Sequence, residues 1–126
     1  MTTQNPYADE AKERWGHTTA FEESAKRVAA MGEDGLQNVV SEGEALLRMI
    51  AAMRSYGAAS PEVQTLIAQH YANLKHFYNP SLTMYAGLAD MYIADPRFTA
   101  YFDKFSPGLA GFMHDAMHTY CDEQAK

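Results

Sequence analysis

Every proline in this chain follows a residue that caps helices, and this pattern constrains the fold more than any other feature. The five pairs are Asn5-Pro6, Ser60-Pro61, Asn79-Pro80, Asp95-Pro96 and Ser106-Pro107. Asn, Ser and Asp accept hydrogen bonds from the free N–H groups at the start of a helix, and proline is well tolerated in its first turn. The pattern therefore predicts short helices separated by tight breaks.

Between these breaks apolar residues recur with a helical period, and no segment alternates as a strand does. We therefore predict an all-α chain of about seven helices that forms a single domain over residues 1–126. The predicted helices cover approximately residues 8–15, 19–31, 36–57, 61–78, 82–93, 96–105 and 107–120.

Charge and composition exclude several classes of protein. The net charge is −6, and the ten Lys and Arg residues form no basic run, so direct binding of nucleic acid by this chain is not expected. The sequence contains neither a membrane-length apolar stretch nor the apolar region of a signal peptide. With Cys121 as its one cysteine, the chain is expected to work in the reducing cytoplasm, away from membranes.

The N-terminal region, residues 5–35, is predicted to be the least stable part. Its second helix has only Phe21, Val28 and Met31 as large apolar residues. Ordering the backbone costs about 1–2 kcal/mol per residue, which so few buried side chains offset poorly. We therefore expect this region to act as a mobile lid.

His114 and His118 lie four residues apart, the spacing at which two histidines on one helical face bind zinc. Asp115 occupies the place of the acid in the zinc-hydrolase motif, but it is shorter than glutamate, and no third ligand follows at a familiar spacing. A metal-dependent hydrolase is therefore one alternative, and a pair of surface histidines near a helix end is another.

Aromatic residues are concentrated in the second half. Ten of the fifteen lie between Tyr71 and Phe112. Because a buried tyrosine hydroxyl without a partner costs about 1–3 kcal/mol, so many tyrosines favour a pocket with a polar rim over a plain core. Such a pocket suits a large, mostly apolar ligand. His70 lies on an apolar helical stripe, either in the core or lining the pocket, and a haem-binding globin would need it as the haem ligand.

Three stretches resemble the TipAS-type antibiotic-recognition domain, the effector half of certain MerR-family transcription regulators. They are ERWGHTTAFEES, HFYNPSLTMYAGLADMYIADPRFTAYFDKFSPGLAGF and HDAMH, and the similarity extends over about residues 5–120. The resemblance implies a globin-like all-helical fold with a deep cleft for bulky amphipathic antibiotics, thiopeptides above all. It also implies that N-terminal helices become ordered over the ligand.

Two positions depart from the family pattern. Some thiopeptide-binding members carry Asp and Cys after the Phe-Tyr pair, and that cysteine can bond covalently to dehydroalanine, whereas this chain has Asn79 and Pro80. Tyr85 stands where such members have a histidine. The resemblance therefore carries over no covalent capture and leaves the ligand open. The family's DNA-binding winged helix and dimerising coiled coil would precede residue 1, so we expect DNA contacts and any dimer to depend on them.

These observations predict a non-enzymatic sensor that binds hydrophobic antibiotics and needs no cofactor or metal. In a full-length regulator the binding would favour transcription activation, and alone it would sequester the drug. The helix faces give the candidate ligand-binding residues, which are Trp15, Phe21, His70, Phe77, Tyr78, Tyr85, Tyr92 and Tyr101.

Overall fold

The computed structural model describes the backbone of residues 19–126 and the side chains from Glu22 onward. Within that part the elements are α2 (Thr19–Ala52), the short 3-10 helix η1 (Arg54–Tyr56), α3 (Pro61–Leu74), α4 (Leu82–Ala94), α5 (Pro96–Asp103) and α6 (Leu109–Gln124). This part of the chain contains no strand, so the all-α prediction is confirmed for it. The helix predicted at residues 8–15 lies outside the described residues, as does Trp15.

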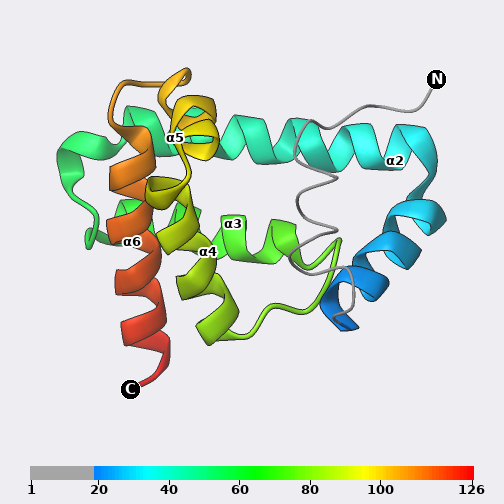
Figure 1. Ribbon diagram of the computed structural model, residues 1–126. Helices are drawn as coiled ribbons and strands as arrows, with labels where there is room; N and C mark the ends of the chain where they lie inside the picture. Colours follow the sequence, from blue (N-terminus) through cyan, green and yellow to red (C-terminus); the bar gives the residue numbers. More distant parts are fainter. Residues whose placement is uncertain (1–18) are drawn as a thin grey trace.

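The described part has five α-helices because two of the predicted ones are joined. α2 runs through both, and at Gly32 the backbone leaves the helical region, with φ 74° and ψ 178°. This conformation is essentially restricted to glycine. The helix therefore resumes in a new direction without a linker, which is visible as the sharp bend in α2 (Figure 1).

Side-chain caps begin three of the helices. Ser60 accepts from the Val63 N–H, Ser81 from the Met84 N–H and Asp95 from the Arg97 N–H. Each cap satisfies one of the backbone donors that a helix start leaves free. The capping pairs in the sequence thus set where α3 and α5 begin.

The start of α6 differs from the prediction. Its N-cap is Gly108, which has a left-handed φ of 84° and no side chain, so the helix begins at Leu109 rather than at residue 107. The Asp103 carboxylate caps the helix from outside, accepting from the Ala110 N–H at 3.0 Å. Ser106, which the sequence suggested as the cap, instead accepts from the Arg54 guanidinium at 2.7 Å.

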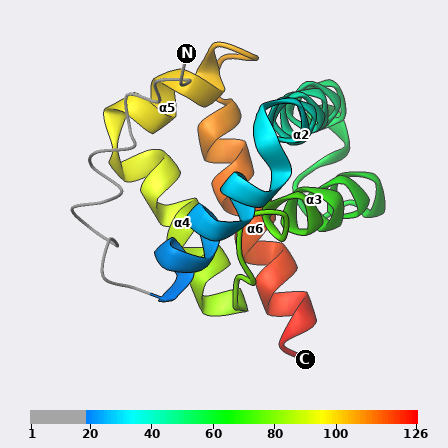
Figure 2. The same cartoon turned by 90° about the vertical axis from the view of Figure 1, so that its right-hand side faces the viewer.

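The helices form two pairs that pack on each other (Figures 1 and 2). α2 lies along α3, α4 lies along α6, and α5 crosses one end of the second pair. Ala89 of α4 and Ala116 of α6 are fully buried in the core. Large apolar side chains from all five helices complete one core, including Ile50, Ile67, Tyr85, Phe102 and Met113.

Polar contacts join α2 to α3 on both sides of the bend. Asn73 is buried, and its amide donates to the Val39 carbonyl at 3.2 Å and to the Glu42 carboxylate at 2.9 Å. On the other side of Gly32, Arg27 donates to the Lys75 carbonyl at 2.6 Å. A cation beside the free carbonyls at the end of α3 is favourable. The bend thus brings the first part of α2 to the C-terminal end of α3.

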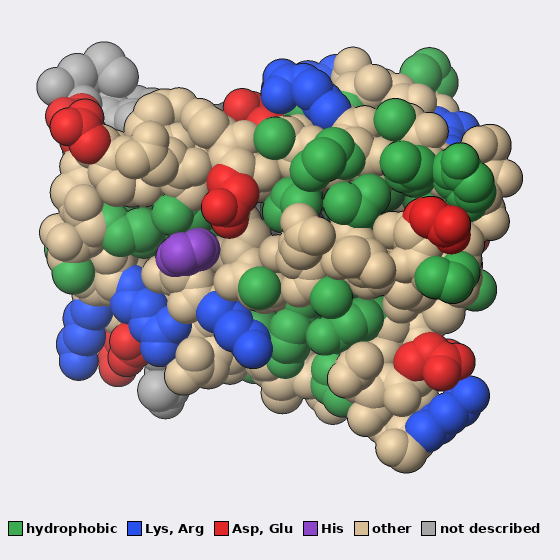
Figure 3. All heavy atoms as spheres, turned by 180° about the vertical axis from the view of Figure 1, so that it is seen from behind, with side chains coloured by type: hydrophobic (Ala, Val, Ile, Leu, Met, Phe, Trp, Pro, Cys, Tyr) green, Lys and Arg blue, Asp and Glu red, His purple; other side chains and the backbone are tan. Residues whose placement is uncertain are grey.

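Surface properties agree with the composition. Seen from behind, acidic and basic side chains are mixed with apolar ones over one face (Figure 3). Among the described residues, no helix is long and apolar enough to cross a membrane.

Replacing Gly32 with alanine is expected to destabilise the protein by about 1–3 kcal/mol, because a Cβ atom is strained at this φ and ψ. Gly111 is a matched control, since it lies in α6 with open space around its Cα, and Gly111→Ala should stabilise by about 0.5–1 kcal/mol. Urea denaturation of both variants measures the two effects. Stabilisation by both substitutions would show that the bend is not intrinsic to the fold.

Candidate ligand-binding site

α4 is apolar on almost every side, which is unusual for a helix at the surface of a small domain. Tyr85, Ala89 and Tyr92 form its buried face. On another face Met84 is 41 % exposed, and Met91, seven residues later, is half-buried. A helix that is apolar all round is normally covered on all sides. The methionine face of α4 is therefore a candidate surface for an apolar partner.

A buried hydrogen bond anchors the inner side of this helix. His70 Nδ1 lies 2.7 Å from the Tyr85 hydroxyl oxygen, and both side chains are buried. Burial lowers the pKa of His70 from 6.5 to about 4. The ring is therefore neutral at pH 7 and shares one hydrogen bond with the Tyr85 hydroxyl, which also lies 3.5 Å from the Ile67 carbonyl oxygen. This bond fixes α4 against α3.

Further tyrosines pack around this pair. The Tyr71 ring lies 4.9 Å from the Tyr85 ring and 5.5 Å from that of Tyr120, centroid to centroid, and Tyr85 and Tyr120 are 5.9 Å apart. The Tyr71 hydroxyl donates to the Pro80 carbonyl, which holds the α3–α4 connection. Burial, followed by the nearby Tyr71, raises the pKa of Tyr78. Tyr78 therefore belongs to the same cluster.

A second group of rings lies where α4 meets α5. The Tyr92 ring is 4.1 Å from Phe102 and 6.2 Å from Phe98, and Tyr101 stacks edge-on at 5.2 Å from Phe102. Burial raises the pKa of Tyr92 strongly, and the hydroxyls of Tyr78 and Tyr101 add to the rise. The Tyr92 hydroxyl thus lies near those of Tyr78 and Tyr101.

The structure accordingly brings together five of the eight predicted residues, namely His70, Tyr78, Tyr85, Tyr92 and Tyr101. Phe77 is half-buried in the turn after α3. Trp15 and the side chain of Phe21 lie outside the described residues. His70, Tyr85 and Tyr92 are buried, whereas Tyr78 and Tyr101 are half-exposed.

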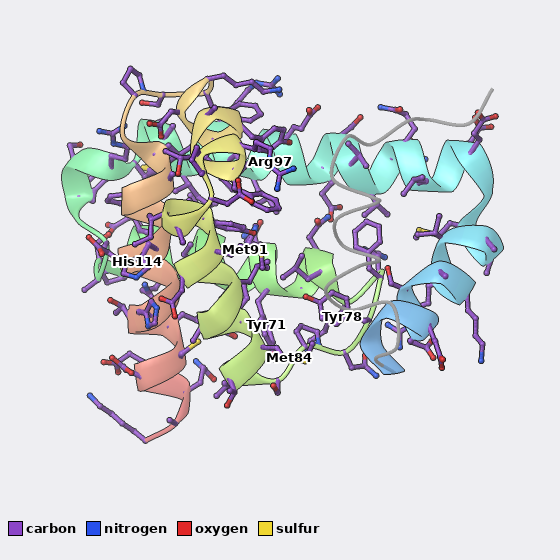
Figure 4. All side chains as sticks on the ribbon, viewed as in Figure 1. Tyr71, Tyr78, Met84, Met91, Arg97 and His114 are labelled. Atoms are coloured by element: carbon purple, nitrogen blue, oxygen red, sulfur yellow. The ribbon has the colours of Figure 1, made fainter. Side chains whose placement is uncertain are left out.

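Met84, Met91 and Tyr71 were not among the predicted residues, although Tyr71, Tyr78, Tyr85 and Tyr92 recur every seven positions in the sequence. Figure 4 shows Tyr78, Met84 and Met91 on the side of α4 that faces away from α6. Tyr71 lies beside them and also packs on Tyr120 of α6. Rings with polar ends and flexible thioethers on one surface are suited to binding, since methionine adapts to irregular apolar shapes.

His114 and His118 lie on the opposite side. Their rings are 4.5 Å apart, and each directs Nε2 towards Oδ1 of Asp90 on α4, at 3.2 Å and 2.7 Å respectively. The predicted histidine pair is therefore confirmed as a pair on one helical face. Asp90 had not been predicted, because it is 24 residues earlier in the sequence and is brought close only by the packing of α4 on α6.

A sequence profile of the TipAS antibiotic-recognition domain matches residues 7–120. The chain belongs to this family. TipAS relatives include the HTH-type transcriptional activator mta of Bacillus subtilis, which is 33 % identical over 96 % of this chain and 47 % of its own length. The HTH-type transcriptional activator TipA of Streptomyces coelicolor is 32 % identical over 88 % of this chain and 45 % of its own length. The chain thus spans less than half of these relatives.

A solved TipAS structure has the same fold. It is the complex of TipAS with nosiheptide, and this TipAS belongs to a thiopeptide antibiotic multidrug resistance system of Streptomyces lividans. The match has a TM-score of 0.86 and 28 % identity and covers 99 % of this chain and 90 % of that one.

These comparisons give no support to the hydrolase alternative. His70, which the haem alternative would need as the iron ligand, is buried, and its Nδ1 is hydrogen-bonded to the Tyr85 hydroxyl.

The pKa of His70 is about 4 in the folded protein and 6.5 in the unfolded chain. As the pH falls, His70 is therefore protonated in the unfolded chain before it is protonated in the folded protein. Stability is therefore expected to fall from about pH 6.5 to pH 4, and His70 alone contributes about 3 kcal/mol to the loss. Urea denaturation between pH 4 and 7 measures it.

His70→Asn removes the titrating ring, so the stability of this variant should depend on pH less steeply than that of the wild type. His76 is exposed, and His76→Asn serves as the control, with an expected slope equal to that of the wild type. Equal slopes for all three proteins would show that His70 is not buried neutral.

Proposed function

We propose that this TipAS domain binds bulky amphipathic antibiotics of the thiopeptide type without catalysing a reaction. The observation that carries the proposal is the half-exposed methionine face of α4 beside the tyrosine cluster. A thiopeptide offers apolar rings to such a surface and polar amides to the hydroxyl groups. The nosiheptide complex of the Streptomyces lividans TipAS supports this choice of ligand.

Within this proposal the eight predicted residues have two roles. Tyr78, Tyr101 and Phe77 contact the ligand, together with Trp15 and Phe21 from the N-terminal region. His70, Tyr85 and Tyr92 are buried, and they form the floor that holds the contacting residues in place. Met84 and Met91 add apolar contact area.

The N-terminal region, residues 5–35, acts in this proposal as a lid that becomes ordered over the ligand. Its described part is joined to α3 through Arg27 and the Lys75 carbonyl. Part of the binding free energy is then used to order the lid, which lowers affinity but couples occupancy to a change of conformation.

In a longer regulator such a change would drive the response. By analogy with mta and TipA, both named transcriptional activators, we propose a MerR-type activator in the cytoplasm, with DNA binding and dimerisation outside the globin-like antibiotic-binding domain. The ligand can shift the regulator only if it binds the activating conformation more tightly. On its own the domain would sequester the drug.

Adding nosiheptide to the purified chain is expected to raise its thermal unfolding midpoint, because a ligand at a hundred times its Kd adds about 2.7 kcal/mol of stability. A Met84→Glu/Met91→Glu double variant should bind at least tenfold more weakly, as two carboxylates would face an apolar ligand. Met49→Glu is the matched control, since Met49 on α2 is 44 % exposed. Binding that is unchanged in the double variant would place the site elsewhere.

The complex with a thiopeptide is expected to dissociate fully on denaturation. Pro80 cannot form an adduct, and Cys121 is buried with its thiol donating to the Leu82 carbonyl at 3.3 Å. Burial raises the pKa of the Cys121 thiol, and the Asp122 carboxylate adds to the rise, so little reactive thiolate forms. Intact-mass measurement after denaturation tests this, and an adduct that maps to Cys121 would contradict it.

A further inference from the structure

Three polar side chains converge between α4 and α6, on the side of α4 away from the candidate ligand site. Asp90 Oδ1 lies 2.7 Å from His118 Nε2 and 3.2 Å from His114 Nε2. The three potential donor atoms all lie within 4.8 Å of one another. Both imidazoles thus point a nitrogen at one carboxylate oxygen across the helix interface.

A fourth side chain orients this group. His114 Nδ1 is 3.0 Å from Oδ1 of Asp115, so the Asp115 carboxylate holds the proton on Nδ1. When Nε2 of His114 gives up its proton, its lone pair is directed at the space shared with Asp90. Histidines that bind metals characteristically donate their other ring N–H to a carboxylate, which fixes the tautomer and makes the ligand nitrogen more basic.

The distances fit a small divalent ion. Ligand atoms about 2.1 Å from a tetrahedral zinc ion are about 3.4 Å apart. The His114–Asp90 pair at 3.2 Å nearly meets this spacing, and the His118–Asp90 pair needs to open by less than 1 Å. Two imidazoles and a carboxylate favour Zn²⁺, Co²⁺, Ni²⁺ or Cu²⁺ over Mg²⁺ and Ca²⁺, which prefer oxygen ligands.

Accessibility and charge also favour an ion. The Asp90 side chain is 62 % exposed, and those of His114 and His118 are 26 % and 37 % exposed, so an ion can enter without opening the fold. Asp90 supplies the carboxylate of the three ligands, and both imidazoles face it. Solvent can supply the fourth ligand.

We propose that Asp90, His114 and His118 form a divalent transition-metal site, oriented by Asp115, that links α4 to α6. The ion would replace the protons now shared between the histidines and Asp90. It would hold in place the helix that carries Tyr85, Met84 and Met91 and would thus stabilise the wall of the ligand site from behind. The site carries no hydrolytic role, and it does not depend on the identity of the antibiotic.

Isothermal titration of the chelator-treated full chain with ZnCl₂ tests the proposal, with CoCl₂ as a spectroscopic probe. We expect one ion per chain, visible Co²⁺ bands of a site with nitrogen ligands, and a thermal midpoint that rises with Zn²⁺. Asp90→Ala and His118→Ala should each weaken Zn²⁺ binding at least tenfold and remove the Co²⁺ bands. Asp115→Asn should weaken it about tenfold, as loss of an outer partner does.

His76→Ala is the matched control, because it removes an exposed histidine in the turn after α3, outside the cluster, and it should bind Zn²⁺ as the wild type does. Circular dichroism confirms that each variant is folded, and Asp90→Asn repeats the test with a side chain of the same size. Absence of stoichiometric Zn²⁺ from the wild type, or equal binding by folded His118→Ala, would overturn the proposal.

Discussion

The hydrogen bond between His70 and Tyr85 is the contact on which the recognition side of this domain depends. It is buried, so losing Tyr85 leaves Nδ1 of His70 without this partner away from water, at a cost of about 1–3 kcal/mol. It therefore fixes the position of α4 along α3. Tyr71 then packs on Tyr85, and its hydroxyl holds the connection at Pro80. A neutral histidine is part of this arrangement, which explains why His70 sits on an apolar stripe.

α4 is the element that the different parts of the molecule share. Its inner face, with Tyr85 and Ala89, packs into the core. Asp90 on a second face meets the histidines of α6. The third face carries Met84 and Met91 and is apolar without being fully buried. Since the three faces belong to one rigid helix, a ligand on the third face and an ion on the second would act on the same body, and each would favour the other if it ordered α4.

Much of this fold was predictable because several of its helices begin at a capping residue and a proline that are adjacent in the sequence. Ser60-Pro61 and Asp95-Pro96 cap and begin helices within three residues, so the sequence alone marks those starts. Gly32 was recognisable as a break, but not as a bend within one helix, because the direction of the chain after a glycine depends on what it packs against. α6 begins at Leu109 because a side chain from α5 caps it, a contact that no local pattern contains.

The grouping of the candidate residues was predictable in part, and their role in binding stays a prediction. Aromatic clustering indicated Tyr78, Tyr85, Tyr92 and Tyr101, and an apolar helical stripe indicated His70. It did not separate the buried rings from the exposed ones, because Tyr85 and Met84 are neighbours in sequence and differ only in which way the helix turns them. Asp90 was missed for a related reason. Its partners are brought to it by the packing of α4 on α6, and no single position in the sequence determines how two helices pack.

The division between a fixed floor and an adaptable surface has a consequence for selectivity under the proposed function. The hydroxyls of Tyr85 and Tyr92 are held by burial and packing, so they cannot adjust to different ligands. Met84 and Met91 can, because an unbranched thioether changes shape at little cost. Differences in apolar shape among antibiotics would then be tolerated, whereas differences in the placement of polar groups next to the half-exposed tyrosines would be discriminated more strongly. A domain built in this way accepts a chemical class of ligand instead of a single compound.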